Sequence, residues 1–133
     1  MRKNTQYRLF LLGILLLAAA LRLPHLNYDL PNLYEEATPM RQAWKMWHWG
    51  NVGFDFNPHF FNYPAFYFYI QFLGQVIYYA VGWLTGRFVS PNDMRILYEQ
   101  DLTELVLLAR LINVVFGLAA VWAITRLGRL LCG

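Results

Sequence analysis

The hydrophobic residues of this chain fall into three long runs separated by more polar stretches. The first run covers residues 9–21, and it extends to residue 26 if Arg22 snorkels toward lipid headgroups. The third run, 105–125, has the roughly 20 residues that a helix needs to cross a bilayer. The pattern therefore predicts transmembrane helices over 9–26 and 105–125.

Basic residues flank these two runs at the ends of the chain. They are Arg2, Lys3, Arg8, Arg126 and Arg129. Because an excess of Lys and Arg marks the cytoplasmic side of a membrane, residues 1–8 and 126–133 are both expected to be cytoplasmic. Two ends on one side require an even number of crossings.

The middle run, 64–84, differs from the other two in being crowded with Phe, Tyr and Trp. Gln71 and Gln75 lie four residues apart in it, on one helical face. Since Tyr and Trp prefer the membrane interface, we predict a helix in or along the outer interface. The alternative is a third transmembrane helix, which would place Arg126 and Arg129 outside.

These patterns predict an all-α membrane protein. Two transmembrane helices flank a periplasmic or extracellular loop, residues 27–104, with interfacial helices at about 36–49 and 64–84. A cleaved signal peptide is the alternative for the N-terminus, since Ala18–Ala20 suit a cleavage site. A retained anchor is favoured, because Arg22 and Pro24 follow at once.

Within the loop, residues 36–49 carry an amphipathic helical pattern. Met40, Ala43, Trp44 and Trp47 share one face, and the other faces carry Arg41, Gln42, Lys45 and His48. Such a helix suits a membrane surface, and it equally suits packing on other helices. Arg41 and Lys45 are candidates to meet an anionic lipid carrier or phospholipid headgroups.

The acidic pair Glu35 and Glu36 precedes this helix. A carboxylate there either stabilises the helix N-terminus or accepts a proton from a hydroxyl nucleophile. Neither His48 nor His59 has a partner at metal-ligand spacing, so the sequence predicts no metal site and no cofactor.

Composition narrows the class of protein further. The 133 residues are 58% hydrophobic and 14% charged, far below the charged share of about a quarter in soluble domains. A net charge of +3 that rests on the chain ends argues against nucleic acid as a partner. The single cysteine, Cys132, excludes an intramolecular disulfide.

Several motifs occur in a fixed order along the chain. They are the basic start with Ala20-Leu21-Arg22-Leu23-Pro24, the acidic pair Glu35-Glu36 with Ala37, the Trp-rich helix, the stretch from Asn57 to Pro64 before an aromatic helix, and Ala109-Arg110-Leu111 opening a helix that closes in Arg126-Leu127-Gly128-Arg129. This ordered set resembles the N-terminal part of a bacterial GT-C membrane glycosyltransferase. The similar enzymes are those related to protein O-mannosyltransferases and aminoarabinose transferases.

The resemblance implies an inverting transfer of sugar from a polyprenyl-phosphate donor to an acceptor hydroxyl, in the bacterial inner membrane. It implies that Glu35 is the catalytic base and Glu36 its neighbour, although the first acid of the family's pair is usually Asp. It makes Arg110, Arg41, His59 and Tyr63 candidates for binding the donor or its lipid carrier. For Arg110, snorkelling at the outer end of a span is the alternative.

Enzymes of this class have many more spans than this chain. We therefore expect a truncated or split N-terminal portion that is inactive in isolation and has the missing C-terminal remainder as a partner. The alternative function is a small non-enzymatic membrane adaptor, whose aromatic outer loop binds a partner.

Overall fold

The computed structural model describes residues 2–24, 26–28, 30 and 37–132, without the side chains of 2–5 and 132. The regular secondary structure of the described residues is entirely helical, with no strand. The helices are α1 (Arg2–Arg22), α2 (Thr38–Lys45), α3 (Ala65–Leu84), α4 (Pro91–Gln100) and α5 (Thr103–Cys132). They form two compact units, one of Met1–Leu26 with Arg110–Gly133 and the other of Asn27–Ala109.

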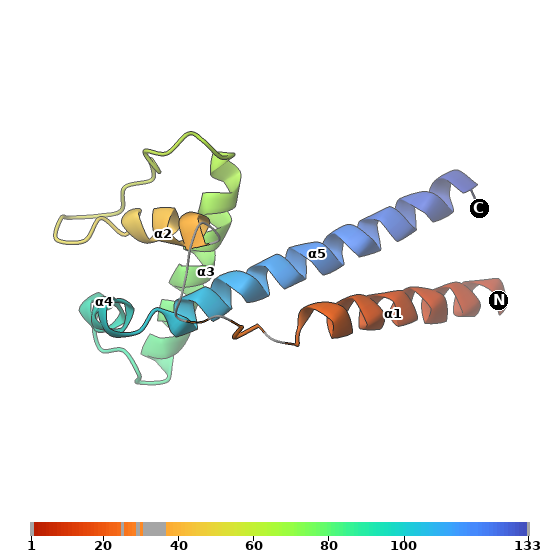
Figure 1. Ribbon diagram of the computed structural model, residues 1–133, viewed down its shortest axis with the longest axis horizontal. Helices are drawn as coiled ribbons and strands as arrows, with labels where there is room; N and C mark the ends of the chain where they lie inside the picture. The colour runs from red at the N-terminus through yellow and green to blue at the C-terminus, as the bar shows by residue number, and fades with distance from the viewer. Residues whose placement is uncertain (1, 25, 29, 31–36, 133) are drawn as a thin grey trace. The chain divides into compact units, whose positions relative to one another are not determined.

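In the first unit, α1 and the C-terminal part of α5 run antiparallel (Figure 1). Near one end the Tyr7 hydroxyl donates to the Thr125 carbonyl over 3.4 Å. Further along, Gly117 leaves room for Arg22, whose Nε would lie 3.1 Å from a Cβ built there. At the far end, the Arg110 guanidinium donates to the Leu26 carbonyl. These contacts bring the first turn of α1 and the last turn of α5 to the same end of the pair.

The bounds of these two helices differ from those predicted. Helix α1 ends at Arg22 instead of residue 26, because Leu23 precedes Pro24 and the α conformation is disfavoured before proline. Helix α5 continues past residue 125 to Cys132. Among the described helices, α5 alone is long and apolar enough to cross a membrane by length and composition, and α3 is not.

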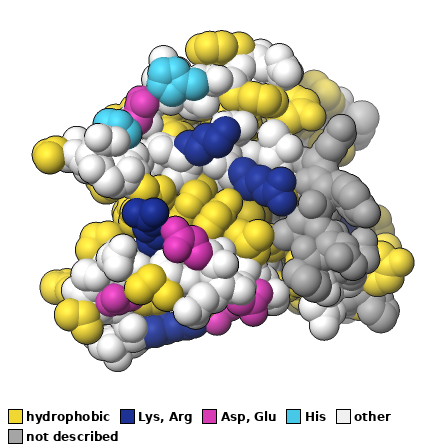
Figure 2. Space-filling model, turned by 60° about the vertical axis from the view of Figure 1, so that its left-hand side comes forward, with side chains coloured by type: hydrophobic (Ala, Val, Ile, Leu, Met, Phe, Trp, Pro, Cys, Tyr) yellow, Lys and Arg dark blue, Asp and Glu magenta, His cyan; other side chains and the backbone are white. Residues whose placement is uncertain are grey.

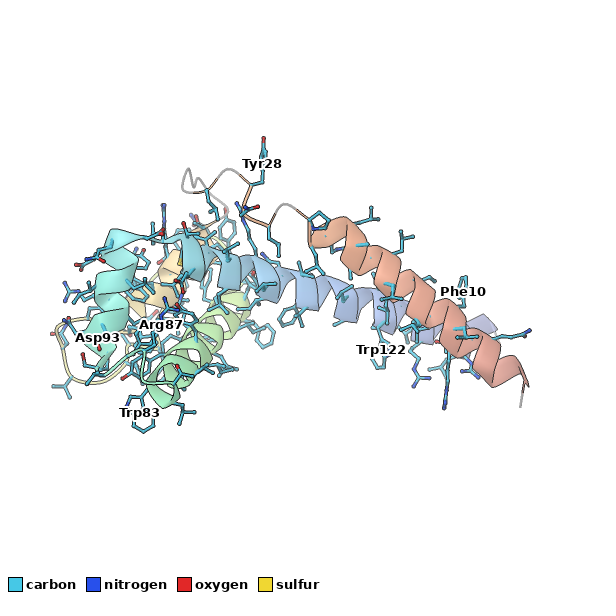
Figure 3. The ribbon with its side chains drawn as sticks, turned by 90° about the horizontal axis from the view of Figure 1, so that it is seen from below. Phe10, Tyr28, Trp83, Arg87, Asp93 and Trp122 are labelled. Atoms are coloured by element: carbon cyan, nitrogen blue, oxygen red, sulfur yellow. The ribbon has the colours of Figure 1, made fainter. Side chains whose placement is uncertain are left out.

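The helix pair keeps many large apolar side chains exposed. Those more than half exposed are Leu9, Phe10, Leu12, Leu16, Leu17 and Leu21 on α1, and Val115, Ile124, Leu127, Leu130 and Leu131 on α5. Phe10 projects outward from α1 in Figure 3. Contiguous exposed apolar surface of this kind is typical of lipid-facing or protein-facing helices.

The core of the second unit is the predicted apolar face of α2 packed on α3. Met40, Ala43, Trp44 and Trp47 are all buried, which confirms the periodicity argument. The prediction for Gln42 was wrong, because the pattern assigned it to a polar face and the structure buries it. The face rich in Trp is covered by protein, which favours the helix-packing interpretation over direct contact with lipid.

Two glutamines of α3 carry the polar contacts of this core, and both are only 1% exposed. Gln75 accepts a hydrogen bond from Trp47 Nε1 over 2.9 Å and donates to the Met40 carbonyl over 3.0 Å. Gln71 donates to the Tyr67 hydroxyl over 2.6 Å. The expectation that both glutamines share one face of the helix is confirmed, and that face points into the core.

Helix α2 ends at Lys45, four residues before the predicted end at residue 49. His48 adopts a left-handed backbone conformation with φ of 54°, which no α-helix contains. Trp49 then folds back, and its Nε1 donates to the Trp44 carbonyl over 3.2 Å. The Trp44 carbonyl also accepts from the Trp47 backbone N–H over 3.3 Å, so it has two donors at the end of the helix.

Helix α4 was not predicted, although the sequence signals its start. Ser90 and Asp93 form a capping box around Pro91, and Asp93 Oδ2 accepts from the backbone N–H groups of Ser90 and Val89 over 2.8 and 2.7 Å. These bonds hold the pKa of the Asp93 carboxyl below its usual range. They therefore stabilise the cap above pH 4 and are lost as the pH falls through the lowered pKa.

An ionic cluster joins α3 and the segment after it to the first turn of α5. Arg87 donates to both carboxylate oxygens of Glu104, over 2.8 and 2.6 Å, and the Tyr78 hydroxyl donates to the same carboxylate. Burial, and secondarily Glu104, raises the pKa of Tyr78 to about 12, so the phenol stays protonated. Trp83 is exposed and points outward at this end of α3 (Figure 3).

The double hydrogen bond of Gln75 predicts a measurable loss of stability when it is removed. Gln75→Leu leaves the buried Trp47 indole N–H without its acceptor and removes the second bond to the Met40 carbonyl, which is expected to lower the free energy of unfolding by about 1–3 kcal/mol. Urea unfolding of the full chain in detergent, followed by Trp fluorescence, measures it. The matched control Gln100→Leu, at an exposed position, should change stability by less than about 0.5 kcal/mol. Equal stability of the two variants would refute the bridging role.

Candidate functional site

The predicted catalytic pair, Glu35 and Glu36, lies outside the described residues. In the sequence it ends two residues before Thr38, the first residue of α2. Thr38 lines a cavity, so the described site begins directly after the acidic pair along the chain.

This cavity, which we call the α2 cavity, has a volume of about 550 Å³ and lies within the second unit. Its lining combines cationic, amide, hydroxyl and aromatic side chains. The lining residues are Thr38, Arg41, Gln42, Trp44, Lys45, Phe60, Asn62, Tyr63 and Tyr98. Figure 2 shows a face of the molecule on which Lys and Arg side chains border hydrophobic ones. A site of this size admits a ligand as large as a phosphosugar or part of a lipid.

Arg41 and Lys45 supply the positive charge of the cavity. They lie four residues apart on α2, so their side chains are neighbours and repel each other by roughly 0.2–0.5 kcal/mol. Both are exposed, and among the described residues neither forms an ion pair. Two adjacent cations that form no ion pair within the described part of the chain favour an anion with more than one acceptor oxygen.

Two pairs of aromatic rings form a wall of the cavity. The rings of Trp44 and Tyr98 stack with centroids 4.0 Å apart and an angle of 6° between their planes. Burial raises the pKa of Tyr98, and the nearby Arg41 cation opposes that shift. Phe60 and Tyr63, which also line the cavity, pack against each other with a centroid distance of 5.6 Å. The wall therefore offers flat apolar surface next to the two cations.

The remaining sequence-predicted residues lie elsewhere. His59 does not line the cavity; its Nε2 lies 2.9 Å from Asp55 Oδ2 in an exposed loop, and its backbone φ is 49°. The Asn57 backbone N–H and then His59 hold the pKa of Asp55 below its usual range. Arg110 belongs to the first unit, where it donates to Leu26. Of the predicted binding residues, Arg41 and Tyr63 share one cavity.

Several cavity residues were not anticipated from the sequence. Phe60 and Asn62 belong to the aromatic stretch that the resemblance uses, but no rule singles them out. Tyr98 lies on α4, and the capping signal Ser90-Pro91 would have placed that helix without showing that Trp44 stacks on it. Contacts between positions 54 residues apart are not encoded in a local pattern.

The side chains available as ligands limit the chemistry of the α2 cavity. Within residues 2–24, 26–28, 30 and 37–132, no three His, Cys, Asp or Glu side chains are grouped to hold a metal ion. What the α2 cavity offers is charge-assisted hydrogen bonding to an anion beside aromatic rings. This combination fits a phosphate ester of an apolar or sugar group.

No family model, curated protein or solved structure matches the chain. The similarity to GT-C glycosyltransferases therefore stays a prediction that rests on the motifs quoted above. The geometry of the α2 cavity is independent of that similarity.

The cavity predicts binding of an isoprenoid phosphate through Arg41 and Lys45. For geranyl phosphate titrated into the full chain in detergent, Arg41→Gln/Lys45→Gln is expected to weaken the affinity roughly tenfold, because two charge-assisted contacts at exposed positions are lost. Isothermal titration calorimetry measures the affinity. His59→Ala serves as the control and should leave the affinity for geranyl phosphate unchanged. The affinity for geraniol should be altered by neither variant. An equal loss in His59→Ala would contradict this assignment.

Proposed function

We propose that this chain is the N-terminal portion of an inverting membrane glycosyltransferase that moves a sugar from a polyprenyl-phosphate carrier to an acceptor hydroxyl. The observation that carries the proposal is the α2 cavity, in which Arg41 and Lys45 lie among aromatic side chains. The cations suit the phosphate, and the rings suit the sugar or the first isoprene unit.

The acidic pair supplies the catalytic part of the proposal. Glu35 and Glu36 immediately precede Ala37 and Thr38 in the sequence. Glu35 acts as the general base that takes the proton of the acceptor hydroxyl as that oxygen attacks the anomeric carbon. The bond from the anomeric carbon to the phosphate oxygen breaks, and the leaving phosphate keeps the electron pair beside Arg41 and Lys45.

The proposal includes a membrane topology in which the chain crosses the bilayer twice. The antiparallel contacts of α1 with α5 bring Arg8, Arg126 and Arg129 to one end of the pair, and the positive-inside rule then assigns that end to the cytoplasm. The exposed apolar surface of both helices supports lipid contact. In this placement Asn27–Ala109 faces the outer side, where lipid-linked sugars are used.

A non-enzymatic adaptor is the second candidate, and exposed aromatic residues of the loop after α2 favour it. Phe54, Phe56 and Phe61 are 49%, 57% and 80% exposed. Such side chains suit a protein partner or lipid. The two functions differ in whether the acidic pair is required.

The membrane placement predicts a labelling pattern. In a Cys132→Ser background, single cysteines at the exposed positions Gln6, Val52, Asn92 and Leu131 are treated in intact cells with a membrane-impermeant thiol reagent. We expect Val52→Cys and Asn92→Cys to react, and Gln6→Cys and Leu131→Cys to react only after permeabilisation. If Leu131→Cys reacts and Asn92→Cys does not, α3 crosses the bilayer and the two-crossing placement is wrong.

The catalytic assignment predicts the effect of removing one carboxylate. With the gene in its genomic context, membranes are given radiolabelled polyprenyl-phosphate sugars, and transfer to endogenous acceptors is measured. Glu35→Gln is expected to slow transfer by about 10²–10⁴-fold, because a general base is lost. Binding of geranyl phosphate should be unchanged, which separates catalysis from donor binding. Transfer at the wild-type rate would instead support the adaptor.

A further inference from the structure

Helix α2 carries a polar stripe in addition to the apolar face that packs on α3. Thr38, Arg41, Gln42 and Lys45 occupy positions i, i+3, i+4 and i+7 of the helix, so their side chains share one face. All four line the α2 cavity. The stripe therefore presents a hydroxyl, two cations and one amide to the same cavity.

Gln42 differs from its neighbours on the stripe in being buried. It is 8% exposed, whereas Arg41 and Lys45 are exposed. Taking an amide out of water costs free energy unless hydrogen bonds replace those to water, so a buried glutamine normally has partners. Gln71 and Gln75, which are also buried, follow this rule.

The Gln42 side chain forms no hydrogen bond within the described part of the chain. In the same part of the chain, no side-chain nitrogen or oxygen is both closed off from the surface and unpaired. The Gln42 amide must therefore reach the surface, and the surface that this residue lines is the α2 cavity. An amide that is largely desolvated, unpaired and open to a cavity has its partner supplied by a ligand.

The two ends of the amide identify the chemical group that pairs with it. A side-chain amide offers N–H donors at one end and a carbonyl acceptor at the other. The oxygens of an ionised phosphate only accept, and an isoprene unit does neither, so both leave the carbonyl unpaired. Sugar hydroxyls donate and accept, and two neighbouring hydroxyls therefore satisfy both ends of the amide.

We propose that Gln42 is a specificity-determining residue of the α2 cavity and that its amide binds two neighbouring hydroxyls of the sugar on the lipid-linked donor. Phosphate held by Arg41 and Lys45 brings the sugar next to the amide, because all three residues lie on one stripe of α2. Tyr63, which is 45% exposed and lines the same cavity, offers its ring to the C–H face of the sugar.

This inference rests on the proposed glycosyl transfer and adds a property to it. A cavity that binds the sugar as well as the phosphate distinguishes the loaded carrier from the empty one. After transfer, the carrier phosphate lacks the hydroxyls that pair with Gln42, so it binds more weakly and leaves.

Isothermal titration calorimetry of the full chain in detergent tests the inference. The ligands are geranyl phosphate esters of glucose, mannose and N-acetylglucosamine, and methyl geranyl phosphate, which has the same charge but no sugar. At least one sugar ester is expected to bind roughly tenfold more tightly than the methyl ester, because hydrogen bonds to the sugar are gained.

Gln42→Met removes both hydrogen-bonding ends of the side chain at similar size. We expect this variant to abolish the gain for the sugar ester and to leave the affinity for methyl geranyl phosphate unchanged. The matched control Gln100→Met, at an exposed position outside the cavity lining, should keep the gain. No gain for any sugar ester in the wild type, or a full gain in Gln42→Met, would overturn the inference. An equal loss of affinity for methyl geranyl phosphate would overturn it as well, because the amide would then contact the phosphate.

A measurement without ligand separates recognition from a structural role. Because an unpaired amide contributes no hydrogen bond to the fold, Gln42→Met should leave the urea midpoint of the ligand-free chain unchanged or raise it. A clearly lower midpoint would show that Gln42 supports the fold instead. If the gain for sugar esters is absent while Arg41 and Lys45 still determine the affinity for geranyl phosphate, only the role of Gln42 fails. If geranyl phosphate does not bind at all, the proposed function fails together with this inference.

Discussion

The second unit depends on the packing of α2 against α3 through Gln75. An eight-residue helix is too short to be stable in water by its own hydrogen bonds, so α2 exists because its Trp and Met side chains are buried. Burying the Trp47 indole requires an acceptor for its N–H, and Gln75 provides it while donating to the Met40 carbonyl. The same packing fixes the rotation of α2 and so directs Arg41 and Lys45 to the cavity side.

The positions of the side chains that line the α2 cavity therefore depend on the packing of the core. Trp44 is buried on one side and stacks on Tyr98 on the other, so one residue connects the packing of α2 to the aromatic wall of the cavity. Tyr98 reaches this position because the capping box starts α4 at Pro91. A change that loosens either α2 or α4 would separate the rings from the cations without touching a ligand.

Sequence periodicity predicted the parts of this arrangement that are local. The apolar face of α2 and the shared face of Gln71 and Gln75 follow from helical spacing alone. The burial of Gln42, the early end of α2 at Lys45 and the stacking of Tyr98 do not, because each depends on backbone conformation or on a neighbour from another helix. The sequence named Arg41 and Tyr63 as separate candidates. Only the folded structure shows that both line one cavity.

The distribution of charge gives the strongest argument that the α2 cavity is a binding site. Segment 27–109 has four cationic residues, and Arg87 and Arg95 are each paired with a glutamate. Its described aspartates are engaged in turns and caps, where their oxygens accept backbone N–H bonds. The two cations left without an ion pair among the described residues are adjacent, and they share a cavity with aromatic rings. Repulsion between Arg41 and Lys45 works against folding, and a bound anion would remove it.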